Sequence, residues 1–367
     1  MTTPLLELDG LTVGYRTRDG VVNAVRGVDL TLARGEKLGV AGESGSGKST
    51  LALALLRLLP PSASVTGRVL LDGEDVLEMG WGRLRAVRWA GASIIFQGAM
   101  HSLNPVQTIG DQITEPILRH RKVGRDAADA RVRELLGQVG MLPDRARSYP
   151  HELSGGQRQR VMIAMALACE PDLVIADEPT TALDVMVQAQ ILTLIDDLVA
   201  SRGISLLMIS HDLSVLSDVC DRLAVMYAGR VVEVGPAGEV FRRARHPYGG
   251  ALASAFPTVG DPASRMRPQG LPGDPPDPQA LPSGCSFHPR CPVRLEHCDS
   301  VDPVLWPAGG SGAAAAAGAA GAAAAAGAAH EAACVRVLPD DGRSLVASPA
   351  GADRAGVDPT SAVEATR

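Results

Sequence analysis

The stretch GESGSGKST (residues 42–50) constrains the fold of this chain more than any other feature. It fits the phosphate-binding pattern G-x-x-x-x-G-K-[ST], which requires a strand before it and a helix after it. The short apolar run KLGVAG (37–42) predicts that buried strand, and LALALLRLL (51–59) predicts the helix. We therefore expect an α/β fold with a mostly parallel sheet, in which this turn binds phosphate groups.

Each part of the loop has a chemical role. The glycines let the backbone curl so that successive N–H groups point at a phosphate chain, and the following helix adds its positive N-terminal end. Lys48 is expected to reach the β- and γ-phosphates, and the Ser49 hydroxyl to bind Mg²⁺. A chance glycine-rich turn is a poor alternative, because both flanking elements are present. The residues expected to contact the nucleotide are Gly42, Ser44, Gly45, Ser46, Gly47, Lys48, Ser49 and Thr50.

A second motif supplies two carboxylates. The apolar strand DLVIAD (172–177) ends in Asp177, and Glu178 follows it, at the strand end where α/β sheets hold their ligands. Asp177 is expected to hold Mg²⁺, directly or through water. Glu178 is expected to act as general base on the attacking water. Acidic residues also end ordinary strands, so this motif gains its meaning from the phosphate-binding loop.

The remaining pattern alternates strands and helices. Residues 5–13 and 23–32 alternate apolar and polar positions, which predicts two strands of a hairpin or edge sheet. Three helices are expected between Thr108 and Cys169. Further buried strands are predicted at 92–97, 205–210 and 222–229, and a helix at about 185–200.

LSGGQ (153–157) decides which phosphate-binding protein this chain resembles. With the two motifs above, it makes the chain similar to the ATPase subunits of ABC transporters. Ser154 is a natural N-cap, and Gly155 and Gly156 leave the start of its helix open to an anion. In that family the loop closes over ATP held by the partner ATPase. The resemblance therefore implies contacts in trans from Ser154, Gly155, Gly156 and Gln157.

Other landmarks of that family follow in order. The resemblance implies that Tyr15 stacks on adenine and that Gln97, at the end of the strand ASIIFQ, contacts Mg²⁺ and water. It also implies that Asp184 crosses the dimer interface and that His211 contacts the γ-phosphate and steadies Glu178. Taken singly, Gln97 could be a strand end, His211 a helix cap and Tyr15 half-buried packing.

Further stretches resemble the dipeptide/oligopeptide importer branch. They are FQGAMHSLNP (96–105), DEPTTALDVMVQAQIL (177–192), HPY (246–248) and LPSGCSFHPRCP (281–292). The resemblance implies an ATP hydrolase that powers peptide import by closing and reopening a dimer. Import of nickel, glutathione or another small solute by the same machinery is an alternative. A soluble ABC ATPase of DNA repair or translation is an alternative of another class, but such proteins usually carry coiled-coil insertions, a zinc hook or two fused halves.

The branch also implies partners and a location. The partners are a second ABC ATPase, favoured as a paralogue in a heterodimer, two transmembrane permease subunits and an extracytoplasmic solute-binding protein. The start MTTPLLELDG has no basic region or apolar core of a signal peptide. We expect a peripheral protein at the cytoplasmic face of the inner membrane. A net charge of −6 and 3% aromatic residues argue against nucleic-acid binding.

Composition divides the chain into parts. Residues 1–97 and 171–245 are expected to form the ATP-binding core, with an antiparallel β subdomain, and residues 98–170 a helical subdomain. Residues 246–338 form a small, irregular, cysteine-containing C-terminal extension. Within it, 308–333 is an alanine- and glycine-rich insertion, expected to be mobile with transient helix at best. A disordered tail is expected at 339–367.

Four cysteines of the extension are expected to form one site: Cys285, Cys291, Cys298 and Cys334, separated by five, six and thirty-five residues. Disulfides are disfavoured in a reducing compartment, and free thiols without a role are possible. Structural zinc usually requires a tight C-x₂₋₄-C pair, which is absent. An iron–sulfur cluster accepts wider spacings, so a structural [4Fe–4S] cluster is favoured over Zn²⁺.

Two arginines near the four cysteines, and the two cysteines outside that group, have expected roles as well. Arg290 and Arg294 lie beside the cluster residues, where they are expected to offset its negative charge. Cys169 and Cys220 lie in apolar surroundings and are expected to be ordinary core residues.

Overall fold

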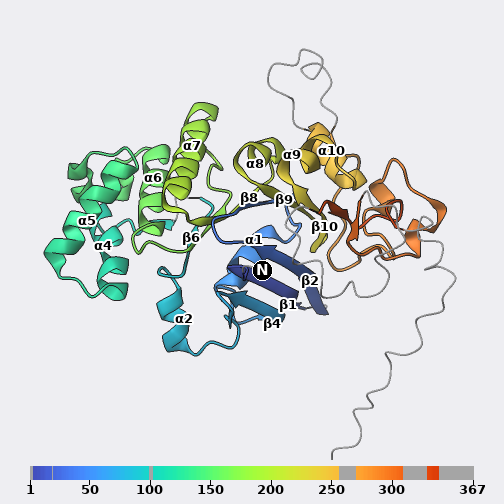
Figure 1. Cartoon of the computed structure of the whole chain (residues 1–367), viewed down its shortest axis with the longest axis horizontal. Helices are drawn as coiled ribbons and strands as arrows, with labels where there is room; N and C mark the ends of the chain where they lie inside the picture. Colours follow the sequence, from blue (N-terminus) through green and yellow to red (C-terminus); the bar gives the residue numbers. More distant parts are fainter. Residues whose placement is uncertain (1–2, 19, 99–101, 256–269, 309–328, 339–367) are drawn as a thin grey trace, which may run out of the picture.

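The computed structural model describes residues 3–18, 20–98, 102–255, 270–308 and 329–338. Its strands form two sheets (Figure 1). The sequence predictions for the tail and for most of the alanine- and glycine-rich insertion fall outside the described residues.

The smaller sheet is antiparallel, with strand order β2-β1-β4-β5. It contains the predicted hairpin at its edge, because β1 and β2 pair antiparallel. Strand β4 on the other side of β1 was not expected from the sequence. The bounds are β1 Leu6–Thr17, β2 Gly20–Leu32, β4 Ala63–Leu71 and β5 Glu74–Asp75.

The larger sheet has the order β11-β12-β10-β9-β3-β8-β7-β6. Strands β9, β3, β8, β7 and β6 are parallel, and β10, β12 and β11 continue the sheet antiparallel. The predicted α/β class with a mostly parallel core is therefore confirmed. The bounds are β3 Lys37–Ala41, β6 Ala92–Ile95, β7 Leu173–Asp177, β8 Ser205–Ser210, β9 Arg222–Tyr227, β10 Arg230–Pro236, β11 Trp306–Pro307 and β12 Glu331–Ala332.

The helices cover the larger sheet and fill the space between the sheets. The helices are α1 Lys48–Leu55, α2 Trp81–Val87, α4 Ile109–His120, α5 Arg125–Gln138, α6 Gly155–Ala166, α7 Val185–Arg202, α8 Leu213–Val219, α9 Ala237–Arg242 and α10 Pro247–Ala255. Helix α1 packs between the two sheets, since Leu51 and Leu55 share a buried cluster with Val13 of β1 and Ile209 of β8. No helix in the described part of the chain is long and apolar enough to cross a membrane.

The predicted helical region is confirmed at α4, α5 and α6, which stand apart on the left of Figure 1. Their apolar faces share one buried cluster with residues of the larger sheet, such as Ile113, Leu136 and Ile163 packed with Ala176 of β7. Burial of that surface, and not helix propensity alone, holds this region against the sheet.

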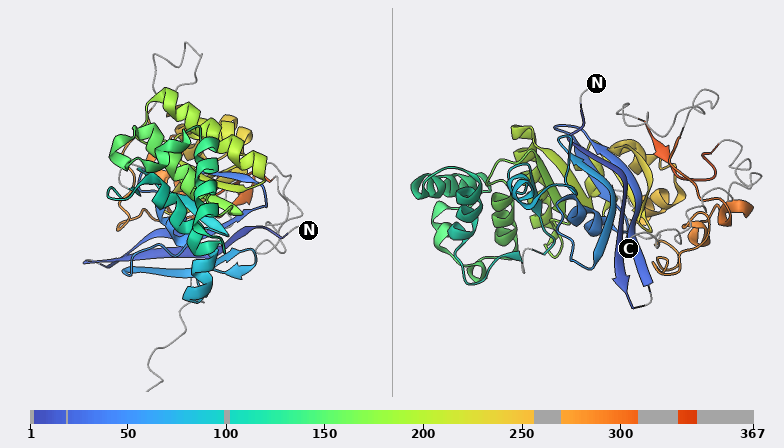
Figure 2. Two further views of the ribbon diagram at one scale, coloured as in Figure 1. Left: turned by 90° about the vertical axis from the view of Figure 1, so that its left-hand side faces the viewer. Right: turned by 90° about the horizontal axis from the view of Figure 1, so that it is seen from below.

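The C-terminal extension attaches to the edge of the larger sheet (Figure 2). As expected, residues 270–284 contain no helix or strand. The end of the predicted insertion behaves differently: Glu331 and Ala332 form β12, paired with Val234 and Glu233 of β10. Ala332 is fully buried. These last insertion residues therefore belong to the folded sheet, because they satisfy the open edge of β10.

Candidate functional site: a nucleotide-binding centre and a cysteine-lined cavity

Two glycines of the phosphate-binding loop are required by close backbone contacts. Gly47 has φ 102° and caps α1, and a Cβ atom there would lie 2.2 Å from the Ala24 carbonyl oxygen. A Cβ on Gly42 would lie 2.4 Å from the Met226 carbonyl oxygen. Either side chain would displace the loop, so both positions require glycine. The helix begins at Lys48, three residues earlier than the apolar pattern predicted, because this cap turns the chain directly into α1.

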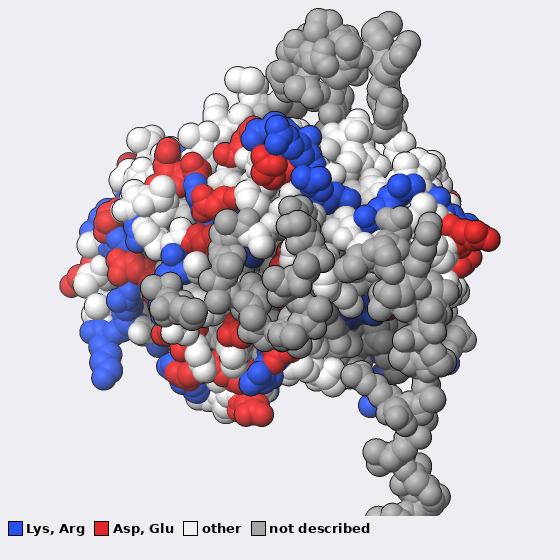
Figure 3. All heavy atoms as spheres, turned by 45° about the vertical axis from the view of Figure 1, so that its right-hand side comes forward, with Lys and Arg blue, Asp and Glu red and all other residues white. Residues whose placement is uncertain are grey.

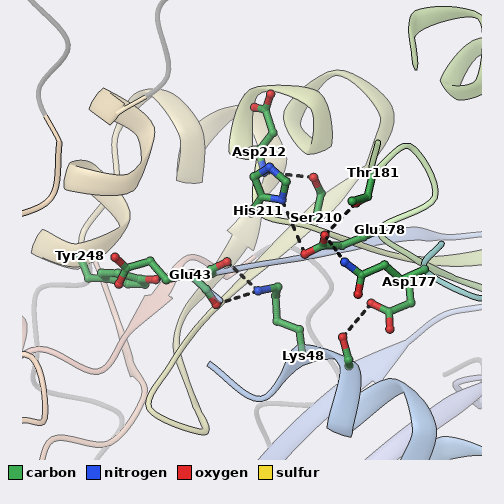
Figure 4. A network of polar contacts seen from close by, with 12 residues as sticks. Glu43, Lys48, Asp177, Glu178, Thr181, Ser210, His211, Asp212 and Tyr248 are labelled. Atoms are coloured by element: carbon green, nitrogen blue, oxygen red, sulfur yellow. Dashed lines mark hydrogen bonds and ion pairs between the residues drawn. The ribbon is translucent and has the colours of Figure 1, made fainter. Parts of the chain in front are cut away.

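Lys48 points from α1 back into the loop (Figure 4). Its Nζ donates to the carbonyl oxygens of Gly42 at 2.7 Å and Glu43 at 2.8 Å. The residue is 5% exposed. Burial lowers the pKa of Lys48, while the carboxylates of Glu178 and Asp177 oppose that shift. The loop therefore holds one buried cation beside the N-terminus of α1.

Ser49 and Asp177 meet across the space between α1 and β7. The Ser49 hydroxyl donates to Asp177 Oδ1 at 3.2 Å. Burial raises the pKa of Asp177, and the hydrogen bond from Ser49 partly offsets this. A hydroxyl and a carboxylate so close together form an oxygen donor set of the kind that suits Mg²⁺. The two residues predicted as metal ligands from separate motifs are thus neighbours.

Glu178 follows directly after β7 in a left-handed backbone conformation, with φ 45°. Its N–H donates to the Ile209 carbonyl of β8 at 3.0 Å, which fixes the turn. The carboxylate Oε2 accepts from Gln97 Nε2 at 3.0 Å and from the Thr181 hydroxyl at 2.9 Å. His211 Nδ1 lies 3.6 Å from Oε1 (Figure 4). Three side chains, Gln97, Thr181 and His211, therefore orient this carboxylate.

The sequence prediction missed part of this arrangement. Gln97 lies two residues beyond the end of β6 at Ile95, and not at the strand end itself. Thr181 was not expected at the site, although its position three residues after Glu178 in DEPTT was a usable signal. Asp212 caps α8 through hydrogen bonds from the N–H groups of Ser214 and Val215, at 2.9 and 3.3 Å, and so fixes the turn that carries His211.

The extension brings its four cysteines around one small cavity. Cys285, Cys291, Cys298 and Cys334 all line it, together with His246 and Phe287. All four are free thiols. Burial raises the pKa of Cys285 to about 11, and the neighbouring thiols raise it as well. Within the described residues, however, no three His, Cys, Asp or Glu side chains are placed to hold a metal ion. The structure therefore gathers the cysteines around one cavity, but not in an arrangement that could hold a metal ion.

The arginines beside the cysteines have other partners than expected. Arg290 forms an ion pair with Glu43 of the phosphate-binding loop, at 2.7 Å, and Arg294 pairs with Asp299 at 3.0 Å. The expectation that they offset the charge of a cluster is thus corrected, since both face carboxylates. Cys169 and Cys220 are 1% and 7% exposed, which confirms them as core residues.

Comparisons with known proteins identify the family. The family model described as ABC transporter matches residues 25–181, and the one described as oligopeptide/dipeptide transporter, C-terminal region, matches residues 232–298. The dipeptide transport ATP-binding protein DppD of Bacillus subtilis is 45% identical over 304 residues, covering 82% of this chain and 90% of that protein. The chain belongs to the ATP-binding proteins of the ABC transporter family.

Other relatives agree with this ABC assignment. The oligopeptide transport ATP-binding protein OppD of Salmonella typhimurium is 45% identical over 302 residues, covering 82% of this chain and 90% of that protein. A solved structure of the ATP-binding cassette MJ0796, dimeric and bound to ADP and Pi, has a TM-score of 0.58 at 28% identity. It covers 63% of this chain and 98% of that one. The structure of cbiO1 from Clostridium perfringens has a TM-score of 0.55 at 31% identity, covering 65% and 91%.

As an ABC ATPase, the protein couples ATP hydrolysis to transport, and its site binds ATP and Mg²⁺. The signature stretch 153–157 lies at the start of α6, which Figure 1 places to the left of α1 with β6 between them. Ser154 caps α6 as predicted: its Oγ accepts from the Gln157 N–H at 3.3 Å, and Gln157 Oε1 accepts from the Ser154 N–H at 3.0 Å.

The remaining predicted residues of the ABC site lie around these centres. The Tyr15 hydroxyl is 3.3 Å from the Thr50 hydroxyl, beside the start of α1. Asp184 caps α7, since its carboxylate accepts from the Val187 N–H at 3.0 Å. A Cβ atom on Gly156 would lie 2.7 Å from Val187 Cγ1, so the signature helix packs tightly on α7.

Proposed function

We propose that the protein powers the import of dipeptides or oligopeptides. The observation that carries this proposal is the match of residues 232–298 to the C-terminal region of oligopeptide/dipeptide transporters. The names of the relatives DppD and OppD support it, as does a putative peptide import ATP-binding protein of Brucella abortus, 48% identical over 314 residues. Import of nickel or glutathione differs from it only in the solute.

Within the ATP site we assign roles from the contacts around the carboxylates. Glu178 is the general base on the attacking water, held by Gln97, Thr181 and His211. Ser49 and Asp177 would hold Mg²⁺ with Gln97 nearby, and the ion would neutralise phosphate charge when bound. Lys48 and the N–H groups of the loop bind the β- and γ-phosphates. Tyr15 packs against the adenine.

Helix α6, which begins in the signature stretch 153–157 and is called the signature helix here, contributes to the ATP site of a second chain. Ser154, Gly155, Gly156, Gln157 and Asp184 contact ATP bound by a partner ATPase, so that two nucleotides lie between two chains. The dimeric ABC cassette with 28% identity supports this arrangement. We assign residues 98–170 to the helical subdomain and 1–97 with 171–245 to the core.

The chain works within a larger complex. The partners are a second ATPase, favoured as a paralogue, two permease subunits and an extracytoplasmic solute-binding protein, and the chain lies peripherally at the cytoplasmic membrane face. We expect no nucleic-acid partner, because the net charge is −6 and, on the face drawn in Figure 3, acidic side chains are interspersed with the basic ones.

Uptake by the native cell tests the peptide proposal. A strain lacking this chain should lose uptake of labelled di- and oligopeptides, and the wild-type chain should restore it. Lys48→Ala, made at equal abundance, should not restore it, because the loop loses its cation. Normal peptide uptake in the deletion strain, together with loss of nickel or glutathione uptake, would move the assignment to that solute.

We also propose a structural [4Fe–4S] cluster held by Cys285, Cys291, Cys298 and Cys334. The support is chemical: four thiols from distant positions line one cavity, and four thiolates are the usual ligands of such a cluster. The cluster would cross-link a segment that has few apolar anchors. Zinc, the alternative, would need the thiols to converge on a single ion.

Metal analysis of the full chain tests this second proposal. Protein purified without oxygen should be brown and contain about four iron and four sulfide ions per chain. Cys291→Ser should bleach it, whereas Cys220→Ser, in the buried core, should keep the colour. Colourless anaerobic protein, with one zinc or no metal, would refute the cluster.

A further inference from the structure

The phosphate-binding loop is tied to the C-terminal extension by a buried ion pair. Arg290 donates to both carboxylate oxygens of Glu43, at 2.7 and 2.9 Å, across 247 positions of sequence. The two side chains are 6% and 22% exposed. Two parallel hydrogen bonds fix orientation as well as distance. Because the pair is largely withdrawn from water, removing one partner leaves a costly unpaired charge on the other.

The extension also holds the backbone of the same residue. The Glu43 N–H donates to the Tyr248 hydroxyl at 2.8 Å (Figure 4). Tyr248 is fully buried and packs against Tyr227 and Phe287, with ring centroids 4.6 and 5.3 Å apart. The Glu43 carbonyl accepts from Lys48 at 2.8 Å. The groups that fix Glu43 therefore also fix one of the two carbonyls that hold the lysine of the ATP site.

Arg290 sits on a turn whose ends are two of the clustered cysteines. In the turn His288–Arg290, the His288 N–H donates to the Cys285 carbonyl at 2.9 Å, and the Cys291 N–H donates to the His288 carbonyl at 3.3 Å. Arg290 Nε also donates to the Pro272 carbonyl at 2.8 Å. The cysteine-lined turn thus sets the place of the guanidinium.

The segment that follows Pro272 also reaches the loop. Side chains of the segment 275–281 line one pocket together with loop residues 43–46. Arg290 therefore fixes both the loop and the stretch of extension that lies against it.

We propose that Arg290 is a positioning residue for ATP binding. It neutralises the Glu43 carboxylate beside the triphosphate site and holds the loop in its binding shape. Because Arg290 belongs to the cysteine-lined turn, the conformation of that turn influences the affinity for ATP. The inference rests on the loop being the ATP site of an ABC ATPase and does not depend on a metal at the cysteines.

Equilibrium binding of a fluorescent ATP analogue to the full chain tests this inference. Arg290→Ala should weaken binding by roughly tenfold to a hundredfold, because it leaves Glu43 charged and unpaired near the phosphates. Arg290→Lys should lose less, since it keeps the charge without the two-bond geometry. The double variant Arg290→Ala/Glu43→Gln should regain most of the affinity, because the unpaired charge is gone. A role in folding alone would lower the fraction of folded protein and leave the affinity of the folded molecules unchanged.

Two controls separate this inference from its premise. Arg294→Ala, in the same segment but paired with Asp299, should bind like wild type. Lys48→Ala should lose binding; if it did not, the loop itself would not be the ATP site. Suppose that Lys48→Ala loses binding but that the affinity of Arg290→Ala stays within about twofold of wild type. The inference about Arg290 would then be wrong, while the assignment of the loop as the ATP site would stand.

The proposed link between the cysteine-lined turn and ATP affinity can be tested with a cysteine variant. Cys291→Ser should weaken ATP binding in the same direction, and its effect should not add to that of Arg290→Ala, because both act through one contact. If Arg290→Ala does not fold, two other measurements test the link. One is the smaller loss of ATP affinity in Arg290→Lys, and the other is whether the losses of Arg290→Lys and Cys291→Ser fail to add in the double variant. Additive losses, or unchanged affinity in both single variants, would refute the link.

Discussion

Glu178 is held in a left-handed backbone conformation that non-glycine residues rarely adopt, and such strain is kept where the surroundings enforce it. Here the enforcing contacts are its N–H bond to Ile209 and the two hydrogen bonds to its carboxylate. Contacts within the chain itself therefore orient the side chain. An oriented carboxylate next to the Ser49–Asp177 pair is what a general base in this site requires.

Replacing this carboxylate by an amide tests the role directly. Glu178→Gln keeps the shape and the acceptor oxygen, so ATP binding should stay normal while hydrolysis falls by about 10²- to 10⁴-fold. Measuring the hydrolysis rate and equilibrium ATP binding on the same preparation checks both parts. Glu134→Gln, a carboxylate on the exposed side of α5, is the matched control and should hydrolyse ATP normally. Turnover near the wild-type rate in Glu178→Gln would remove the assignment.

Candidate site residues could be named from the sequence where the signal is local. Lys48 and Ser49 stand in one motif, and Asp177 and Glu178 in another, so their chemistry could be predicted before their contact was known. The pair Glu43–Arg290 could not be predicted, because its partners lie 247 positions apart and neither belongs to a spacing pattern. Arg290 was instead assigned to the nearest cysteines, since sequence shows neighbours along the chain but not across the fold.

At the scale of elements, buried strands were easiest to predict. β3, β7 and β8 are short apolar runs buried along nearly their whole length, and runs of five or six residues are too short for a buried helix. Strand β4 was missed because it is half exposed and contains Gly67 with φ 91°, which weakens the alternation. Helix α2 was missed because seven residues carry only two buried positions.

The start of α4 offers a test of one element. The Thr108 hydroxyl accepts from the Asp111 N–H at 3.2 Å and donates to the Asp111 carboxylate at 2.7 Å. Thr108→Ala should lower the free energy of unfolding by about 1 kcal/mol at pH 7, as measured by chemical denaturation. Thr108→Ser keeps the hydroxyl and should lose little. An alanine variant as stable as wild type would show that the cap contributes nothing.

The same cap predicts a dependence on pH. Hydrogen bonds from Thr108, and then from Arg125, lower the pKa of Asp111 in the folded protein. A carboxylate with a lowered folded-state pKa stabilises the fold above its ordinary pKa of about 4, and this contribution is lost as the pH falls through the lowered value. The difference in stability between wild type and Thr108→Ala should therefore shrink on acidification.

At the scale of the whole molecule, the layers followed from the sequence but the attachment of the extension did not. Alternating strands and helices predicted the parallel core. The extension contains few periodic apolar positions, so its anchors could not be predicted. Among the described residues they include β12 on the edge of β10, the ion pair of Arg230 with Asp302, and the contact of Arg290 with Glu43. Each is a long-range contact that a local pattern does not encode.

The largest-scale prediction concerns the assembly of two ATPases. The signature helix α6 lies apart from α1 of its own chain, so in our proposal Ser154 acts on the nucleotide of the partner. Ser154→Arg should therefore disable the partner's site, and Lys48→Ala the chain's own. Placed together in one chain of a dimer, the two changes disable both sites. Placed on opposite chains, they fall on the same site and leave the other intact.

Hydrolysis by purified dimers of defined composition distinguishes the two placements. The dimer with lesions on opposite chains should keep activity, and the dimer with both lesions on one chain should lose it. Ser201→Arg, an exposed serine on α7, is the control for the added charge and should behave as wild type. The reverse pattern, with activity kept only when both lesions share a chain, would mean that each chain completes its own site. Two nucleotides would then not be shared between the chains.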